Sequence, residues 1–99
     1  MDLDDKLYHM TNVLMDLCDK LELKNRSTFI LKYNLSQEES RTIDTIFLEL
    51  LSNETQVTID TFTDIVNNRL ERHFSKPVIE ELLEVYADYQ PKAIKRVKL

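Results

Sequence analysis

The chain has 99 residues, of which 42% are hydrophobic and 31% charged, a composition typical of a folded domain. It contains no glycine, which argues against the tight phosphate-binding loops of nucleotide folds. No apolar run approaches the roughly 20 residues of a membrane-spanning helix, and the acidic N-terminus lacks the apolar segment of a signal peptide. The only cysteine, Cys18, cannot form an internal disulfide. We therefore expect a cytoplasmic protein that does not enter a membrane.

The net charge of −5 is spread unevenly along the chain. Residues 1–90 hold all 18 acidic side chains and nine basic ones, whereas residues 91–99 hold no acid. The basic residues of this last segment are Lys92, Lys95, Arg96 and Lys98. An acidic body repels the nucleic-acid backbone, so direct nucleic-acid binding is disfavoured and only the tail is suited to contact phosphate. We expect one helical domain over 1–90 and a basic tail over 91–99, which is either a frayed, solvated end or a basic contact.

The first helix has the clearest periodic pattern. Apolar residues recur at spacings of 4, 3, 4, 3 and 4, which is the a/d pattern of a coiled coil over nearly three heptads. We call these residues the heptad seam: Leu3, Leu7, Met10, Leu14, Leu17 and Leu21. Val13 and Cys18 widen the apolar face, and Cys18 is interpreted as a small buried apolar group. Two alternatives remain open: the seam packs on the other helices of the same chain, or it pairs with a second copy.

Capping residues predict where the next helices begin. Ser27 is expected to cap a short second helix that stops at Asn34, because asparagine tolerates the left-handed conformation. Ser36 and Glu39 form a capping box for a third helix, which ends near residues 52–54. Residues 55–59 are rich in β-branched side chains, but no second strand is evident to pair with them. We interpret this segment as an extended connector.

Two more helices complete the predicted fold. Thr58 caps a fourth helix, and Pro77 lies in the first turn of a fifth, where its missing N–H is not needed. The fifth helix is expected to present an acidic face outward, made of Glu80, Glu81, Glu84 and Asp88. Pro91 stops it and begins a short basic turn. The sequence therefore predicts an all-α, compact array of about five helices with a long, heptad-patterned N-terminal helix.

No combination of residues indicates catalysis or a bound cofactor. His9 and His73 lie outside any zinc-binding motif. The adjacent glutamate pairs at 38–39 and 80–81 point about 100° apart on a helix, so their carboxylates cannot act as a facing acid/base pair. Two helix-turn-helix alternatives, at 31–39 and at 75–88, fail because a long apolar-faced helix follows the first and an acidic helix forms the second. We expect no enzyme, no metal and no cofactor.

The order of caps and core positions resembles a family. The matching features are the heptad-like first helix, Phe29, and the motifs Leu35-Ser36-x-Glu38-Glu39, Ile43-x-x-Ile46, Glu49-Leu50, Val57-Thr58-x-Asp60 and Val78-Ile79. Together they resemble the small bacterial helical family typified by YhaI over residues 7–86. The chain departs from the family pattern at Asn34, where a glycine is expected, and in its basic ending. The resemblance implies an all-helical, oligomeric protein from Gram-positive bacteria or their mobile elements, and it implies no activity.

Three functional hypotheses follow from these patterns. The first is a helical protein–protein interaction module that self-associates through the heptad seam. The second is an acidic inhibitor, encoded by a phage or mobile element, whose acidic face occupies a basic nucleic-acid-binding surface of a host protein. The third is a nucleic-acid binder that uses the basic tail. The first is our leading hypothesis, with protein partners and a homo-oligomer expected.

Overall fold

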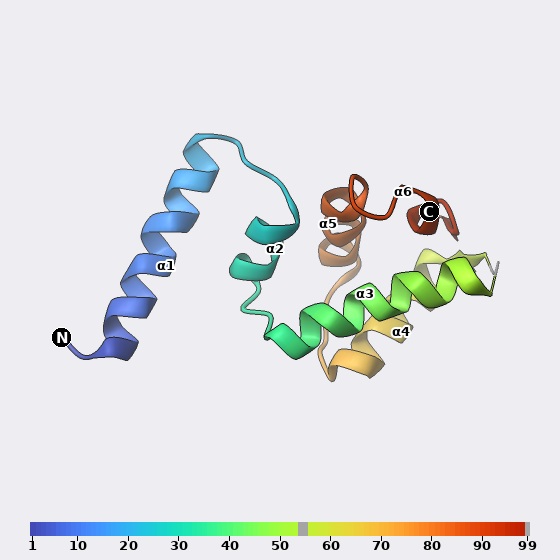
Figure 1. Cartoon of the computed structure of the whole chain (residues 1–99), viewed down its shortest axis with the longest axis horizontal. Coiled ribbons are helices and arrows are strands. Elements are labelled where there is room, and N and C mark those ends of the chain that lie inside the picture. Colours follow the sequence, from blue (N-terminus) through green and yellow to red (C-terminus); the bar gives the residue numbers. More distant parts are fainter. Residues whose placement is uncertain (54–55, 99) are drawn as a thin grey trace.

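The computed structural model describes residues 1–53 and 56–98, which fold into six helices and two very short strands. Figure 1 shows their arrangement. In chain order the elements are α1 (Leu3–Lys20), α2 (Arg26–Lys32), α3 (Gln37–Ser52), β1 (Val57–Thr58), α4 (Ile59–Leu70), α5 (Lys76–Tyr86), α6 (Pro91–Ile94) and β2 (Val97–Lys98). The predicted all-α array with a long first helix is confirmed. The third helix ends at Ser52, while residues 54 and 55 lie outside the described part.

Side-chain caps fix the starts of the main helices. The capping box of Ser36 and Glu39 at α3 and the Thr58 cap of α4 form as predicted. The prediction that Ser27 caps α2 is wrong. Asn25 is the cap, and its side chain and that of Thr28 exchange hydrogen bonds of 2.9 Å with each other's backbone N–H groups. The helix therefore begins earlier, because an asparagine at the N-cap and a threonine three residues later satisfy two free donors.

In the described part of the chain, three non-glycine residues adopt the left-handed conformation where helices end. Asn34 has a φ of 52° after α2, which confirms its predicted role as a stop. Glu22 and Glu71 each have a φ of 54°, after α1 and at the end of α4. This conformation costs a residue with a Cβ roughly 1–2 kcal/mol. The glycine-free chain bears that cost at its turns.

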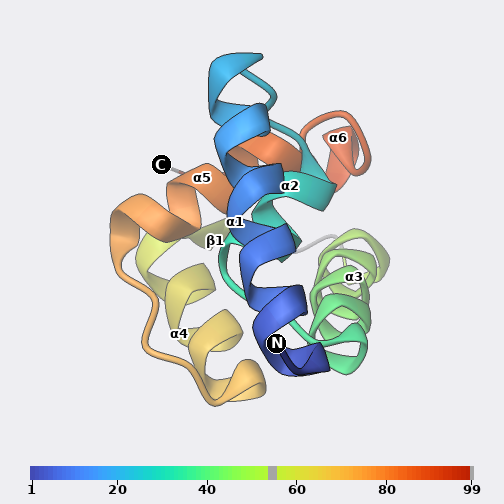
Figure 2. The same cartoon turned by 90° about the vertical axis from the view of Figure 1, so that its left-hand side faces the viewer.

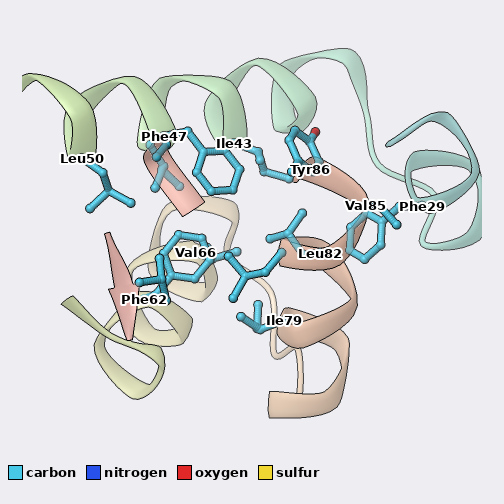
Figure 3. Packing of buried hydrophobic residues seen from close by; sticks show 14 of the residues in the cluster. Phe29, Ile43, Phe47, Leu50, Phe62, Val66, Ile79, Leu82, Val85 and Tyr86 are labelled. Atoms are coloured by element: carbon cyan, nitrogen blue, oxygen red, sulfur yellow. The ribbon is translucent and has the colours of Figure 1, made fainter. Parts of the chain in front are cut away.

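The hydrophobic core lies between α3, α4 and α5 and is closed by α2 and the C-terminal segment. Figure 3 shows the aromatic side chains at its centre. The Phe47 ring lies 5.6 Å from that of Phe62 and 5.2 Å from that of Tyr86, measured between centroids, and all three residues are fully buried. These rings join the third, fourth and fifth helices into one core.

The C-terminal segment belongs to this core. Ala93 and Val97 are buried in the same cluster, and the Val57 N–H donates to the Arg96 carbonyl at 2.8 Å. Strands β1 and β2 pair in parallel, with Val57 opposite Val97. Two predictions are therefore wrong: the end of the chain is not frayed over 91–98, and residues 57–58 do have a strand to pair with. That strand was missed because it comprises only two residues of a basic segment.

Candidate functional site

Helix α1 stands apart from the core, and none of its residues is buried. Figures 1 and 2 show it as an outer layer that covers α2. The two helices run in opposite directions, since Cys18 lies near Phe29 while Leu7 and Thr11 lie near Leu31. A half-buried stripe of Thr11, Met15 and Cys18 faces α2, so Cys18 is only partly covered, contrary to its interpretation as a buried group. Helix α1 is thus attached to the molecule through one narrow face.

The heptad seam lies on a different face of α1. Its six side chains are between 46% and 69% exposed: Leu3, Leu7, Met10, Leu14, Leu17 and Leu21. At about 3.6 residues per turn, the middle of the seam lies about 90° around α1 from the stripe that faces α2. The chain therefore leaves its longest apolar stripe uncovered. A contiguous exposed apolar surface of this kind is typical of an interaction site.

Helix α2 is fixed to α5 by Glu81. This carboxylate accepts a hydrogen bond of 2.5 Å from the Tyr33 hydroxyl and a 3.0 Å contact from the Lys32 ammonium. Burial opposes ionisation of Glu81, but these two donors outweigh it and lower the pKa of the carboxyl below its usual value. The prediction that Glu81 points outward is wrong, because it is half-buried and used within the chain.

The start of α2 is fixed to α3 and α5 by Arg26. Its guanidinium donates to Asp44 at 3.1 Å and to Ser40 at 3.3 Å, and it lies 5.7 Å and 5.3 Å from the ring centroids of Tyr86 and Tyr89. Burial raises the pKa of the Tyr86 phenol, and the nearby guanidinium opposes that rise. These contacts anchor the residue that directly follows the α1–α2 connector.

A third anchor joins the end of α2 to the end of α4. The Arg72 guanidinium donates to both carboxylate oxygens of Glu39, at 2.7 and 2.8 Å, and to the Asn34 carbonyl at 3.1 Å. These hydrogen bonds lower the pKa of Glu39. Helix α2 is therefore held at both ends, and it provides a fixed base for α1.

The other two predicted contact surfaces are smaller than the seam. With Glu81 used internally, only Glu80 and Glu84 remain as exposed carboxylates of the predicted acidic face on α5. The prediction that Asp88 belongs to this helix is wrong, because α5 ends at Tyr86 and Asp88 lies exposed in the turn that follows. In the basic segment Lys92, Lys95 and Lys98 are exposed, whereas Arg96 is half-buried. Small sets of exposed charged side chains such as these two are common on the solvated surfaces of proteins.

Hollows occur at two places besides the α1–α2 junction. A hollow of about 370 Å³ lies on the outer side of α2 and is lined by Ser27, Ile30, Leu31, Asn34 and Leu35. Another, of about 360 Å³, lies between α3 and α4, where Arg69 and Glu49 form a two-pronged ion pair over Ile46 and Leu50. Sequence reasoning missed the α2 hollow. The i, i+3, i+4, i+7 spacing of 27, 30, 31 and 34 was its available signal, but it is hard to recognise in a seven-residue helix.

The described residues contain no group of three or more His, Cys, Asp or Glu side chains placed to hold a metal ion. His9 and His73 are both exposed. Within the same part of the chain, no helix is both long and apolar enough to cross a bilayer. A scan of family models gave no match, and comparisons with curated proteins and with solved structures gave none either. The resemblance to the YhaI family therefore stays a prediction.

Proposed function

We propose that this protein is a helical, non-enzymatic interaction module whose first partner is a second copy of itself, bound through the heptad seam. The observation that carries the proposal is the exposure of all six seam residues on a helix with no buried residue. Apolar side chains at a/d spacing gain stability when a facing helix covers them. The three anchors of α2 support the proposal, because they hold the base of α1 in place before a partner arrives.

The acidic-inhibitor hypothesis has weaker support. Its four-carboxylate face loses Glu81 to Lys32 and Tyr33 inside the molecule. Of the remaining carboxylates, Glu80 and Glu84 lie on α5 and Asp88 lies in the turn after it. A charged stripe on an exposed helix is common, whereas a long uncovered leucine stripe is not.

Mass in solution tests the proposal. Light scattering across a wide protein concentration range is expected to show an oligomer for the intact chain and a folded monomer for Leu14→Asp. The aspartate would have to be buried between the two copies with no opposite charge beside it, which is energetically unfavourable. The matched control is Leu48→Asp, which places the same charge on a leucine of α3 that is 55% exposed and lies outside the seam. This variant should remain an oligomer.

The contrary outcomes are equally clear. A wild-type chain that stays monomeric at every concentration would overturn the proposal. So would a Leu14→Asp oligomer as stable as the wild type. Circular dichroism of each variant shows whether it is folded, so that loss of association is not confused with unfolding.

A further inference from the structure

We propose that the second copy binds antiparallel and covers α1 and α2 together, so that the two α1–α2 hairpins form a four-helix bundle. This inference rests on the proposed self-association and specifies its geometry. It starts from the heptad seam and from the stripe on α2 that we call the α2 free face: Ser27, Ile30, Leu31 and Asn34. Among the described residues nothing covers the seam. The α2 free face is only partly open: Ile30 and Leu31 are half-buried, and Leu31 and Asn34 also border α1, but the outer hollow remains accessible.

The two stripes face the same side of the α1–α2 layer. On α1 the seam lies about 90° from the side that faces α2, and on α2 the free face lies about 130° from the side formed by Thr28 and Lys32, which faces α1. For each helix viewed from its own N-terminus, the rotation from the side that contacts the other helix to the exposed stripe has the same sense. Because α1 and α2 run in opposite directions, the stripes turn toward the same side. Each helix therefore has one contact face toward the other helix of its hairpin and a second face toward the shared outer side, as in a four-helix bundle.

Where the seam of one copy packs on the seam of the other, the direction of pairing decides whether the α2 free face is covered as well. If the two copies of α1 pair in parallel, the α2 of the second copy lies on the far side of the pair, and the hollow on the α2 free face stays open. If they pair antiparallel, α1 lies on α1 and α2 lies on α2, so both stripes are covered. A two-fold axis across the helices produces this arrangement with identical surfaces.

Length and charge favour the same geometry. The seam spans less than three heptads, which is short for a stable coiled coil without additional contacts, and α2 widens the apolar contact. Parallel pairing would gather the carboxylates of Asp2, Asp4 and Asp5 from both copies at one end. Antiparallel pairing separates them and places opposite helix-dipole ends side by side.

Cysteine cross-linking tests the orientation. All variants carry Cys18→Ala. In the antiparallel register Leu14 lies opposite Met10 of the second copy, whereas in a parallel pair Leu14 lies opposite itself. A disulfide needs Cα atoms within about 7 Å. Under mild oxidation an equal mixture of Met10→Cys and Leu14→Cys chains should yield the mixed cross-linked dimer, while Leu14→Cys alone should yield none. A cross-link from Leu14→Cys alone, or no cross-link in an intact dimer, would overturn the antiparallel arrangement.

The role of α2 has its own test. Ser27→Glu places a charge in the α2 hollow and suits a first helical turn, so the monomer should fold. We expect the dissociation constant to rise roughly tenfold or more, because the added carboxylate would be buried against the second copy without a charged partner. The matched variant Ser27→Ala should leave it unchanged. If Ser27→Glu dimerises as tightly as wild type while Leu14→Asp is monomeric, the α2 contact is wrong although the seam-mediated association stands. A monomeric wild type would overturn both.

Discussion

Helices α1 and α3 have similar lengths, 18 and 16 residues, and each has an apolar stripe at helical spacing, yet only the stripe of α3 is buried. Five residues of α3 are buried, including Ile43, Phe47 and Leu50, whereas α1 buries none. The stripe of α3 carries a phenylalanine and branched aliphatic side chains that meet α4 and α5, while the stripe of α1 consists of leucines and one methionine in strict a/d order. Periodicity thus indicates that a helix has an apolar face, but it does not say which chain covers that face.

The largest expected effect comes from comparing a core residue of α3 with a seam residue of α1. Phe47→Ala should lower the free energy of unfolding by about 3–5 kcal/mol, because it leaves a cavity beside Phe62 and Tyr86. Leu14→Ala, measured at a concentration where the chain is monomeric, should change it by less than about 0.5 kcal/mol. Urea unfolding followed by circular dichroism measures both. Equal losses for the two variants would show that the seam belongs to the core of the monomer.

A second prediction concerns the C-terminal strand β2, which also belongs to the core. Val97→Ala should cost about 1–3 kcal/mol in unfolding free energy, because Val97 is buried beside β1. The neighbouring Lys98→Ala is the control, since its side chain is exposed and its strand pairing uses only the backbone. Thermal unfolding of the two variants at one concentration checks this. A Val97→Ala protein as stable as the control would mean that the last strand adds nothing to the core.

Acid should weaken the ion pairs that hold α2, the helix on which α1 packs. The pKa of Glu39 in the folded protein lies below its ordinary value of 4.5, so its stabilising contribution is complete above pH 4.5 and is lost as the pH falls through the folded-state pKa. Glu81 behaves in the same way. Glu39→Gln should cost about 1–2 kcal/mol at pH 7 and show a weaker decline of stability between pH 5 and pH 3. Urea unfolding across that pH range measures it, and identical pH profiles for variant and wild type would contradict the assigned ion pair.

The smallest expected effect concerns the left-handed turns. Glu71→Gly should stabilise the protein by about 0.5–1 kcal/mol, because glycine removes the Cβ clash at a φ of 54° at a smaller cost in backbone entropy. Glu80→Gly is the opposite control: it lies within α5, where glycine should destabilise by about 1 kcal/mol. Melting temperatures measured side by side should move in opposite directions. A shared decrease would exclude relief of strain at Glu71.

Local signals predicted much of the fold. The box of Ser36 and Glu39, the Thr58 cap and the Asn34 stop act through neighbours within a few residues, so their patterns could be read along the chain. The parallel pairing of Val57 with Val97 depends on partners 40 positions apart, and nothing local marks it. The same distinction between local patterns and long-range contacts applies to the candidate site.

The seam was visible as a heptad pattern, whereas its exposure depends on where the connector at 21–25 directs α1. Glu81 looked like a surface charge because its partners, Lys32 and Tyr33, lie about 50 residues earlier. Side-chain partners at that distance follow from the packing of whole helices, which the order of residues does not reveal.

The parallel pairing of β1 with β2 also has a consequence for protein synthesis. Ala93 and Val97 complete the core, and a ribosome adds them long after it has added α1. Helix α1 precedes every core element in the chain, so its apolar stripe leaves the exit tunnel while the core is still incomplete. Neighbouring nascent chains on one messenger RNA would then expose their first helices to each other before either chain is finished.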